Sequence, residues 1–229
     1  MTDPNQPENR QRLRLTFAKK RAVKYIAHLD LALAWERALR RAQLPLAYSQ
    51  GFNPRPKMQF ASGLPLGTTG SAEILDIVLN EPVDPAAALD QIRPKLPEGI
   101  GLSAVEEVPL KAPTLQNLLR EAEYRVTVET DTPPDELERR IAALLAADEI
   151  IQQRQRKKRL ESVNLRPWLH RLAIEQVDNG DVSLFMRLTA GQHGNLRPEA
   201  VLEALGLAEC WADIERTRLI FEEGALTAP

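Results

Sequence analysis

The stretch of the sequence best suited to chemistry is YSQGFNPRPK, residues 48–57. It combines the residues of a tight turn with two cations, Arg55 and Lys57. Gly51 is predicted to adopt a positive φ, and Pro54 and Pro56 are predicted to stiffen the backbone on either side of Arg55. Such a loop would hold the two cations outward as a preorganised anion site. Alternatively, the same rigidity only closes the edge of a sheet, with both cations in solvent.

Positive charge is concentrated in two parts of the chain, the first of which includes this loop. Residues 1–60 hold 12 Lys+Arg against 4 Asp+Glu, and residues 151–171 hold 7 against 1, although the whole chain has a net charge of −2. Cations that meet phosphates release counterions, which gives salt-dependent and sequence-independent affinity. The sequence therefore predicts an RNA-binding basic face, whereas the alternative is two solvated basic surfaces. Besides Arg55 and Lys57, the candidate contacts are Lys19, Lys20, Arg21, Lys24, Arg154, Arg156, Lys157, Lys158 and Arg159.

Aromatic side chains accompany the loop. Tyr48 and Phe52 flank Gly51, and Phe60 follows Lys57 closely. They could stack on unpaired bases, as aromatic residues do in single-strand RNA sites, or they could pack under the loop to support its turn.

A catalytic alternative centres on His28. With Tyr25 and Lys24 it could move protons and neutralise charge in a metal-independent cleavage of RNA. His28 could equally cap or pack the start of a helix. Neither a metal site nor a cofactor site is expected, because the single cysteine, Cys210, and the three histidines show no ligand spacing.

Hydrophobic periodicity predicts the elements of the first half of the chain. Strands are expected at residues 12–18, near 46–49, at 71–80 and at 100–108, and helices at 28–43 and 84–97. The order strand, helix, strand, strand, helix, strand is that of a ferredoxin-like split β-α-β unit.

The second half repeats this order with one extra strand. After a proline-containing linker at residues 109–122, strands are expected at 123–130 and 213–223, and helices at 133–147 and 197–206. A hairpin turn is predicted at residues 177–180, and a short extended piece is predicted to run into the basic arm at 149–159. The prediction is α+β with two tandem ferredoxin-like domains, at residues 11–108 and 123–229, behind a disordered tail at 1–10.

The composition also indicates in which cellular environment the protein works. No run approaches the ~18 consecutive apolar residues of a membrane span, and the lone cysteine suits a reducing compartment. We therefore expect a soluble, cytoplasmic protein.

Long stretches of the sequence resemble one bacterial family. They include YIAHLDLALAWERALRRAQLPLAYSQGFNPRPKMQFASGLPLG, SAEILDIVL, AVEEVPLKAPTLQ, AEYRVTV and NLRPWLHRL. In these stretches the chain is similar to the radical-SAM-linked family of uncharacterised bacterial proteins. One departure is Ala27, where the family pattern implies a small hydroxyl residue. The family has no established activity to carry over, but its association with radical SAM proteins and with genes for RNA metabolism implies a radical SAM partner and an RNA-related role.

Three hypotheses remain open at this stage. In the first, a non-catalytic accessory protein presents ribosomal or transfer RNA to a radical SAM enzyme. In the second, a metal-independent endoribonuclease is related in fold to the enzymes that process CRISPR repeat RNA, although the glycine-rich loop that those enzymes often carry near the last strand is missing from this sequence. In the third, the chain is a protein-interaction module. The sequence does not fix the oligomeric state.

Overall fold

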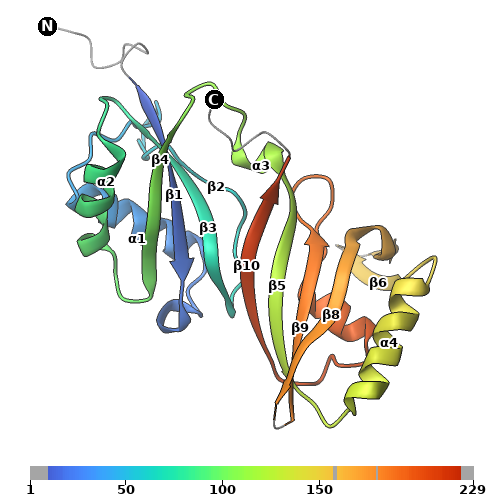
Figure 1. The fold of residues 1–229 in the computed structure, drawn as a ribbon. Coiled ribbons are helices and arrows are strands. Elements are labelled where there is room, and N and C mark those ends of the chain that lie inside the picture. The colour runs from blue at the N-terminus through green and yellow to red at the C-terminus, as the bar shows by residue number, and fades with distance from the viewer. Residues whose placement is uncertain (1–9, 157–158, 179, 223–229) are drawn as a thin grey trace, which may run out of the picture. The chain divides into compact units, whose positions relative to one another are not determined.

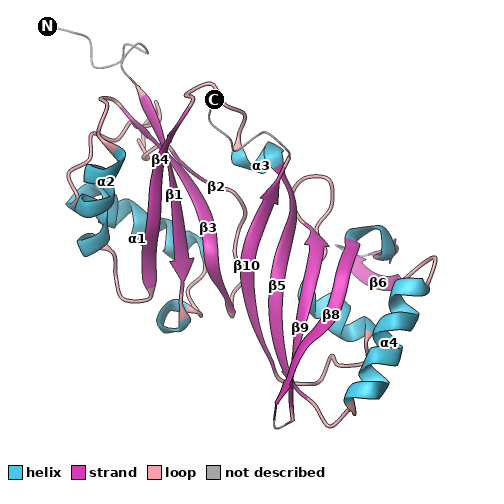
Figure 2. Cartoon of the chain, in the orientation of Figure 1, coloured by secondary structure: helices cyan, strands magenta, loops and turns pink. Residues whose placement is uncertain are grey.

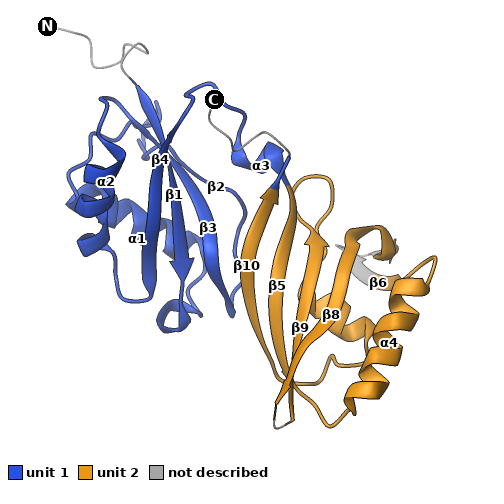
Figure 3. Cartoon of the chain, viewed as in Figure 1, with its two compact units in different colours: residues 1–119, 221–229 blue, residues 120–220 orange. Residues whose placement is uncertain are grey.

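A computed structural model describes residues 10–156, 159–178 and 180–222. The protein is α+β, and its chain divides into two compact units. Unit 1 comprises residues 1–119 and 221–229, and unit 2 comprises residues 120–220 (Figure 3). None of the described helices is long and apolar enough to cross a membrane.

Unit 1 contains an antiparallel sheet and two principal helices (Figures 1 and 2). Its strands are β1 (Gln11–Lys19), β2 (Met58–Phe60), β3 (Thr68–Leu79) and β4 (Ile100–Val108). Its helices are α1 (His28–Arg41), α2 (Pro85–Ile92) and the short α3 (Leu115–Leu118), with 3₁₀ turns η2 (Arg21–Val23) and η3 (Arg93–Lys95). The strands are ordered β4-β1-β3, and β2 pairs with β3.

The core of unit 1 lies between this sheet and the helices. Alternate residues of β1, namely Leu13, Leu15 and Phe17, are fully buried, as a period of two requires for a strand with one face on the core. On α1, Leu31, Trp35 and Leu39 supply the facing stripe, and the rings of Phe17 and Trp35 meet edge to face at 5.1 Å.

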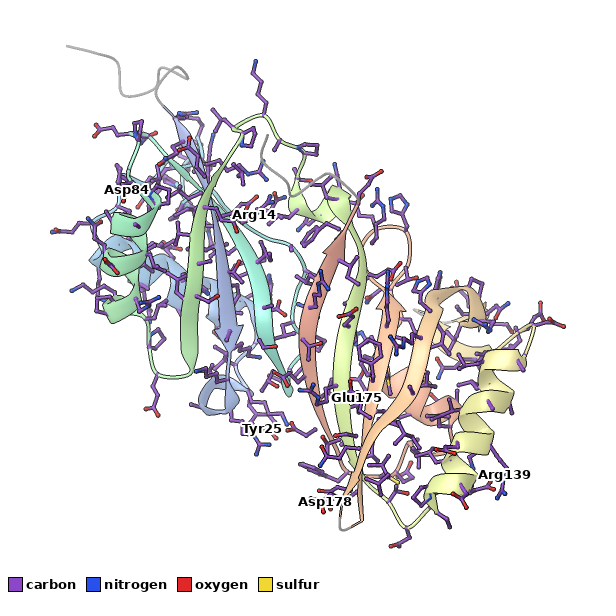
Figure 4. The ribbon with its side chains drawn as sticks, viewed as in Figure 1. Arg14, Tyr25, Asp84, Arg139, Glu175 and Asp178 are labelled. Carbon is purple, nitrogen blue, oxygen red and sulfur yellow. The ribbon has the colours of Figure 1, made fainter. Side chains whose placement is uncertain are left out.

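The other face of the same sheet buries charge. Arg12 and Arg14 both bind the carboxylate of Asp76 on the neighbouring strand β3, through hydrogen bonds of 2.6–3.0 Å. Arg14 is labelled in Figure 4. Arg12 also donates to the backbone carbonyls of Ala112 and Pro113 in the segment that leads to α3. All three charged side chains are less than a tenth exposed, so this cluster is part of the interior.

Helices α1 and α2 begin differently. The Asp84 side chain accepts a hydrogen bond from the Ala87 backbone N–H at 2.9 Å, which caps α2 as the Asp-Pro sequence predicts. Ala27 holds the corresponding position before α1 in extended conformation, without a side-chain cap.

Unit 2 contains four further principal strands and its own helices. Its principal strands are β5 (Leu119–Glu129), β8 (Leu169–Asp178), β9 (Asp181–Thr189) and β10 (Ala212–Phe221), in the order β10-β5-β9-β8. Its helices are α4 (Pro134–Ala146) and α5 (Pro198–Ala204), with a 3₁₀ turn η4 (Arg166–Trp168). Strands β8 and β9 form the predicted hairpin, in which Asp178 pairs with Asp181.

A separate hairpin is inserted between α4 and β8. Strands β6 (Ile151–Arg156) and β7 (Arg159–Asn164) pair only with each other among the described strands, in register from Ile151 with Asn164 to Arg156 with Arg159. The Leu165 N–H donates to the Ile150 carbonyl at 2.8 Å at the base of the hairpin, where both residues are buried. The described part of the segment that was predicted as one extended piece and an arm therefore forms two paired strands.

Two elements differ from the sequence expectations. The predicted strand near 46–49 forms only isolated bridges, from Leu46 to Leu79 and from Tyr48 to Pro56, and the paired strand β2 follows the loop instead. The chain turns back at the loop before it can extend the pairing of residues 46–49. In addition, the expected linker at 109–122 contains α3 and the first four residues of β5. The tail expected at 1–10 lies almost wholly outside the described residues.

Candidate nucleic-acid interface

Loop 48–57 is closed by its own backbone. Beyond the bridge between Tyr48 and Pro56, the Ser49 N–H donates to the Arg55 carbonyl at 2.8 Å, and the Arg55 N–H donates to Ser49 Oγ at 3.0 Å. Gly51 has a φ of +135°, as predicted, and the site around it is open. These contacts fix the backbone on both sides of the loop tip.

The loop presents its cations and one ring to solvent. Arg55 and Lys57 are exposed, and Phe52 is fully exposed. Pro54 is also exposed, whereas Pro56 is buried. An exposed aromatic ring close in sequence to two cations is the composition of a single-strand RNA contact. The other two aromatics differ, because Tyr48 and Phe60 are half-buried.

Helix α1 holds one end of the loop. The Arg40 guanidinium lies 5.6 Å from the centre of the Tyr48 ring, a cation–π arrangement. Its Nη2 also pairs with Glu36 Oε1 at 2.8 Å, one helical turn earlier. Tyr48 is thus a support for the loop, whereas Phe52 is left free for stacking.

A pocket of about 410 Å³ opens beside the loop, entirely within unit 1. Three residues of its wall lie four apart on α1: His28, Ala32 and Glu36. The remaining lining residues come from the end of the loop, from β2 and the turn after it, and from α3: Arg55, Pro56, Met58, Gln59, Phe60, Gly63 and Gln116.

Several polar groups in this pocket have no partner among the residues that the structure describes. The side chains of Arg55, Gln59 and Gln116 make no hydrogen bond or ion pair with the described part of the chain. Within the described residues, Glu36 is paired only through Oε1, which leaves its second oxygen available. Polar groups that line a pocket without forming hydrogen bonds to one another are typical of a ligand-binding site.

His28 forms part of the wall. Its ring packs edge to face against Phe60 with centroids 5.1 Å apart. Its Nδ1 is buried and has no hydrogen-bond partner, and a Cβ placed on Gly63 would lie 4.0 Å from it. A proton on Nδ1 would be a buried N–H without an acceptor, which costs about 1–3 kcal/mol. The tautomer with its proton on Nε2 is therefore favoured, and in this form the imidazole is a hydrogen-bond donor.

The other members of the catalytic hypothesis lie elsewhere. Tyr25 is 73% exposed, and the Lys24 ammonium lies 5.7 Å from the centre of its ring. Neither residue is among those that line the pocket with His28. Figure 4 labels Tyr25, at the lower end of unit 1 in that view.

The structure contradicts the prediction that Lys19 contacts RNA. It is 1% exposed, and its ammonium donates to the backbone carbonyls of Lys24, Ile26 and Thr68 at 2.9, 3.3 and 3.3 Å. It belongs to the interior, because the strand alternation that buries Phe17 also buries Lys19. Lys20 and Arg21, the next residues, are exposed.

The second basic segment is described only by its backbone. Arg154 and Arg156 lie in β6 and Arg159 begins β7, so these three positions lie toward the turn of the hairpin. Lys157 and Lys158 lie outside the described residues, and the positions of all five side chains stay predictions.

Sequence reasoning missed Glu36, Gln59 and Gln116 as site residues. Glu36 follows His28 by eight residues on a predicted helix, so the spacing alone indicated a shared face. No comparable signal existed for Gln116, which reaches the pocket through long-range packing of α3 near β2. No group of residues suited to a metal ion occurs in the described ranges.

Comparison with solved structures shows where this fold recurs. The chain is similar to a chain of a Cbf5–Nop10–Gar1 complex, with a TM-score of 0.50 and 16% identity over 93% of this chain and 50% of that one. It is similar also to a chain of an H/ACA RNP bound to a substrate RNA containing 2′-deoxyuridine, with a TM-score of 0.51 and 15% identity over 90% of this chain and 47% of that one. The protein thus spans about half the length of these relatives, and at such identities the likeness is one of fold alone.

The sequence itself places the chain in a family. No curated protein matches it. A family model described as an uncharacterized protein conserved in bacteria, DUF2344, matches residues 12–198. Because this match covers most of the sequence, the chain belongs to the DUF2344 family.

Proposed function

We propose that this protein binds RNA through loop 48–57 and the pocket beside it, without acting as a catalyst. The observation that carries the proposal is the loop itself, which presents Arg55, Lys57 and Phe52 to solvent on a backbone held by its own hydrogen bonds. Because the loop backbone that carries these cations is already held, it loses little entropy when the cations meet phosphates.

Two further observations support RNA as the ligand. Lys20 and Arg21 add exposed positive charge to unit 1, and the sequence of the β6–β7 hairpin in unit 2 includes Arg154, Arg156 and Arg159. One structural relative is a chain of an H/ACA RNP bound to a substrate RNA. The same fold therefore occurs in a setting that involves RNA.

We further infer two ferredoxin-like units in tandem. The strand order β4-β1-β3, with β2 beside β3, follows the split β-α-β pattern of first, second, third and fourth strands arranged 4-1-3-2. The order β10-β5-β9-β8 follows the same pattern when the β6–β7 hairpin is treated as an insertion.

The role as an accessory to a radical SAM enzyme rests on the sequence resemblance. In this proposal the protein works in the cytoplasm and presents ribosomal or transfer RNA to that enzyme. Tyr25, Leu29 and Leu66 are exposed apolar side chains of unit 1 and are candidates for a contact with a protein partner. A radical SAM protein that co-purifies with the native protein, and co-purifies less with the Leu29→Asp variant, would support this part of the proposal. Unchanged co-purification with the variant would contradict a contact at Leu29.

A titration of structured RNA tests the binding proposal. Replacing both Arg55 and Lys57 by Ala is expected to weaken binding by roughly tenfold or more, on the order of 1–2 kcal/mol for two phosphate contacts. The matched control replaces the exposed Lys95 and Lys111 by Ala, which removes the same charge far from the loop in sequence. Equal affinities of the two double variants, or no binding by the native protein at low salt, would contradict the proposal.

Metal-independent cleavage of RNA remains a second candidate because His28 and Arg55 line one pocket. Incubation of labelled RNA with the protein in a chelator decides between the two. Cleavage that disappears in His28→Ala would establish the enzyme, and intact RNA with both proteins would reject it.

A further inference from the structure

We propose that the pocket beside loop 48–57 binds a single unpaired guanine base, with Arg55 on the phosphate of the same nucleotide. This inference rests on the proposed function and deepens it, because it assigns base selectivity to a site whose proposed phosphate and stacking contacts are independent of sequence. It starts from the unpaired polar groups of the pocket rather than from its charge.

Glu36 selects the base. A carboxylate accepts hydrogen bonds and donates none. The Watson–Crick edge of guanine offers two adjacent donors, N1–H and N2–H₂, which match Glu36 Oε2 and the lone pair of Oε1 that Arg40 leaves unused. Adenine and cytosine place a ring acceptor next to their single amino donor, and uracil flanks its one donor with two acceptors. Only guanine meets Glu36 without bringing an acceptor against it, and the ion pair to Arg40 fixes the side chain in place.

Gln59 and Gln116 complete the polar edge of the pocket. Each amide has both donor and acceptor atoms, and neither amide is engaged elsewhere in the described chain. They can donate to O6 and N7 of guanine, as can His28 when its proton is on Nε2. These groups donate hydrogen bonds to O6 and N7 of guanine, which the Glu36 carboxylate cannot do because it has no proton to donate.

The remaining wall is apolar and suits a flat ring. Met58, Phe60, Pro56 and Ala32 contribute carbon surface, and Phe60 is already held edge-on by His28 and by Phe17. The volume of about 410 Å³ lies within the range of about 300–1,000 Å³ that is usual for small-molecule sites. Arg55 lines the same pocket from the exposed loop, where a phosphate attached to the nucleoside would reach it.

The test compares oligonucleotides that differ at one base. Binding of an oligouridine with one central guanosine is measured against the same oligomer with adenosine, cytidine or uridine at that position. The native protein is expected to prefer guanosine by roughly tenfold, the size of one good carboxylate or bidentate base contact. Free GMP, measured against AMP, CMP and UMP, forms a separate arm, which tells a free nucleotide from a guanosine within RNA.

Two variants examine the pocket itself. Glu36→Gln replaces the acceptor pair with a mixed amide and is expected to abolish the preference, and Ala32→Leu is expected to fill the pocket at little cost to the helix. Asp30→Asn is the matched control, because Asp30 is an exposed acid on the same helix outside the pocket. Melting temperatures show whether each variant is folded.

The outcomes separate this inference from the proposed function. A guanosine preference that Glu36→Gln and Ala32→Leu remove and Asp30→Asn retains supports the pocket. RNA binding with equal affinity for all four bases overturns the inference and leaves the proposed function standing. Selective binding of GMP without affinity for any oligonucleotide supports the pocket as a nucleotide site and overturns the RNA proposal.

Discussion

At the scale of single residues, the start of α1 is incompletely capped. Ala27 has the extended conformation of a capping residue, and its carbonyl accepts the first helical hydrogen bond from Leu31 at 3.0 Å, but its methyl group accepts nothing. The first N–H groups of the helix therefore lack the side-chain acceptor that serine or threonine would supply.

Ala27→Ser is expected to stabilise the protein by about 1 kcal/mol, because the new hydroxyl can accept from the free N–H groups. The difference in unfolding free energy is measured by urea titration. Ala22→Ser, at an exposed position before the helix, serves as the control. An equal effect of both substitutions would mean that capping is not the cause.

Residue types predicted some features of the site and not others. The positive φ of Gly51 was predictable because glycine takes this conformation without strain, and the exposed Arg55 followed from two neighbouring prolines. The burial of Lys19 was not predictable from its type, since lysine is seldom buried. The buried position is favourable only because the fold brings the carbonyls of Lys24, Ile26 and Thr68 within hydrogen-bonding distance of the ammonium.

At the scale of elements, substitutions of the buried charged residues of β1 and β3 are expected to lower the stability of the protein most. Asp76 is the shared acceptor of two guanidinium groups, both almost fully enclosed. Removing a shared partner leaves uncompensated charge in a medium that solvates it poorly.

Asp76→Asn is therefore expected to destabilise the protein by about 3–5 kcal/mol. Asp90→Asn, at an exposed position of α2, is expected to change the unfolding free energy by less than about 0.5 kcal/mol. Denaturant titrations of both variants provide the measurement. Similar midpoints for the two would show that the cluster around Asp76 is not a source of stability.

Elements with strong periodicity were predicted well, and short ones were not. The spans of β1, α1 and β4 differ from the sequence expectation by at most two residues at either end, because each repeats its apolar pattern over several residues. The three residues of β2 carry no such repeat. Their pairing with residues 75–77 of β3 depends on the turn of loop 48–57, so the strand was expected before the loop rather than after it.

At the scale of the whole molecule, the proposed RNA binding predicts a salt dependence whose steepness is set by the number of phosphates in contact with the protein. For single strands the logarithm of the binding constant falls by about 0.7 per contacted phosphate for each tenfold rise in salt. This slope adds up the contacts of the loop, of the basic turn after β1 and of the β6–β7 hairpin.

Replacing Arg55 and Lys57 by Ala should reduce that slope by about 1.4, since two phosphate contacts are removed. Titrations at several salt concentrations give the slope for the native protein and for the double variant. The Lys95 and Lys111 double variant should keep the native slope. An unchanged slope after loss of the loop cations would show that other basic residues make all of the phosphate contacts.

The enclosure of Lys19 has a consequence for covalent chemistry. An amine-acetylating reagent cannot reach an ammonium that is 1% exposed and bound to three carbonyls, whereas it can reach the exposed Lys20 beside it. Acetylation of Lys19 should therefore proceed only through molecules in which unit 1 has opened, and its rate relative to Lys20, read by mass spectrometry, should rise with urea. Equal rates at both lysines without denaturant would contradict the enclosure. The ratio of the acetylation rates of Lys19 and Lys20 therefore reports how often unit 1 opens.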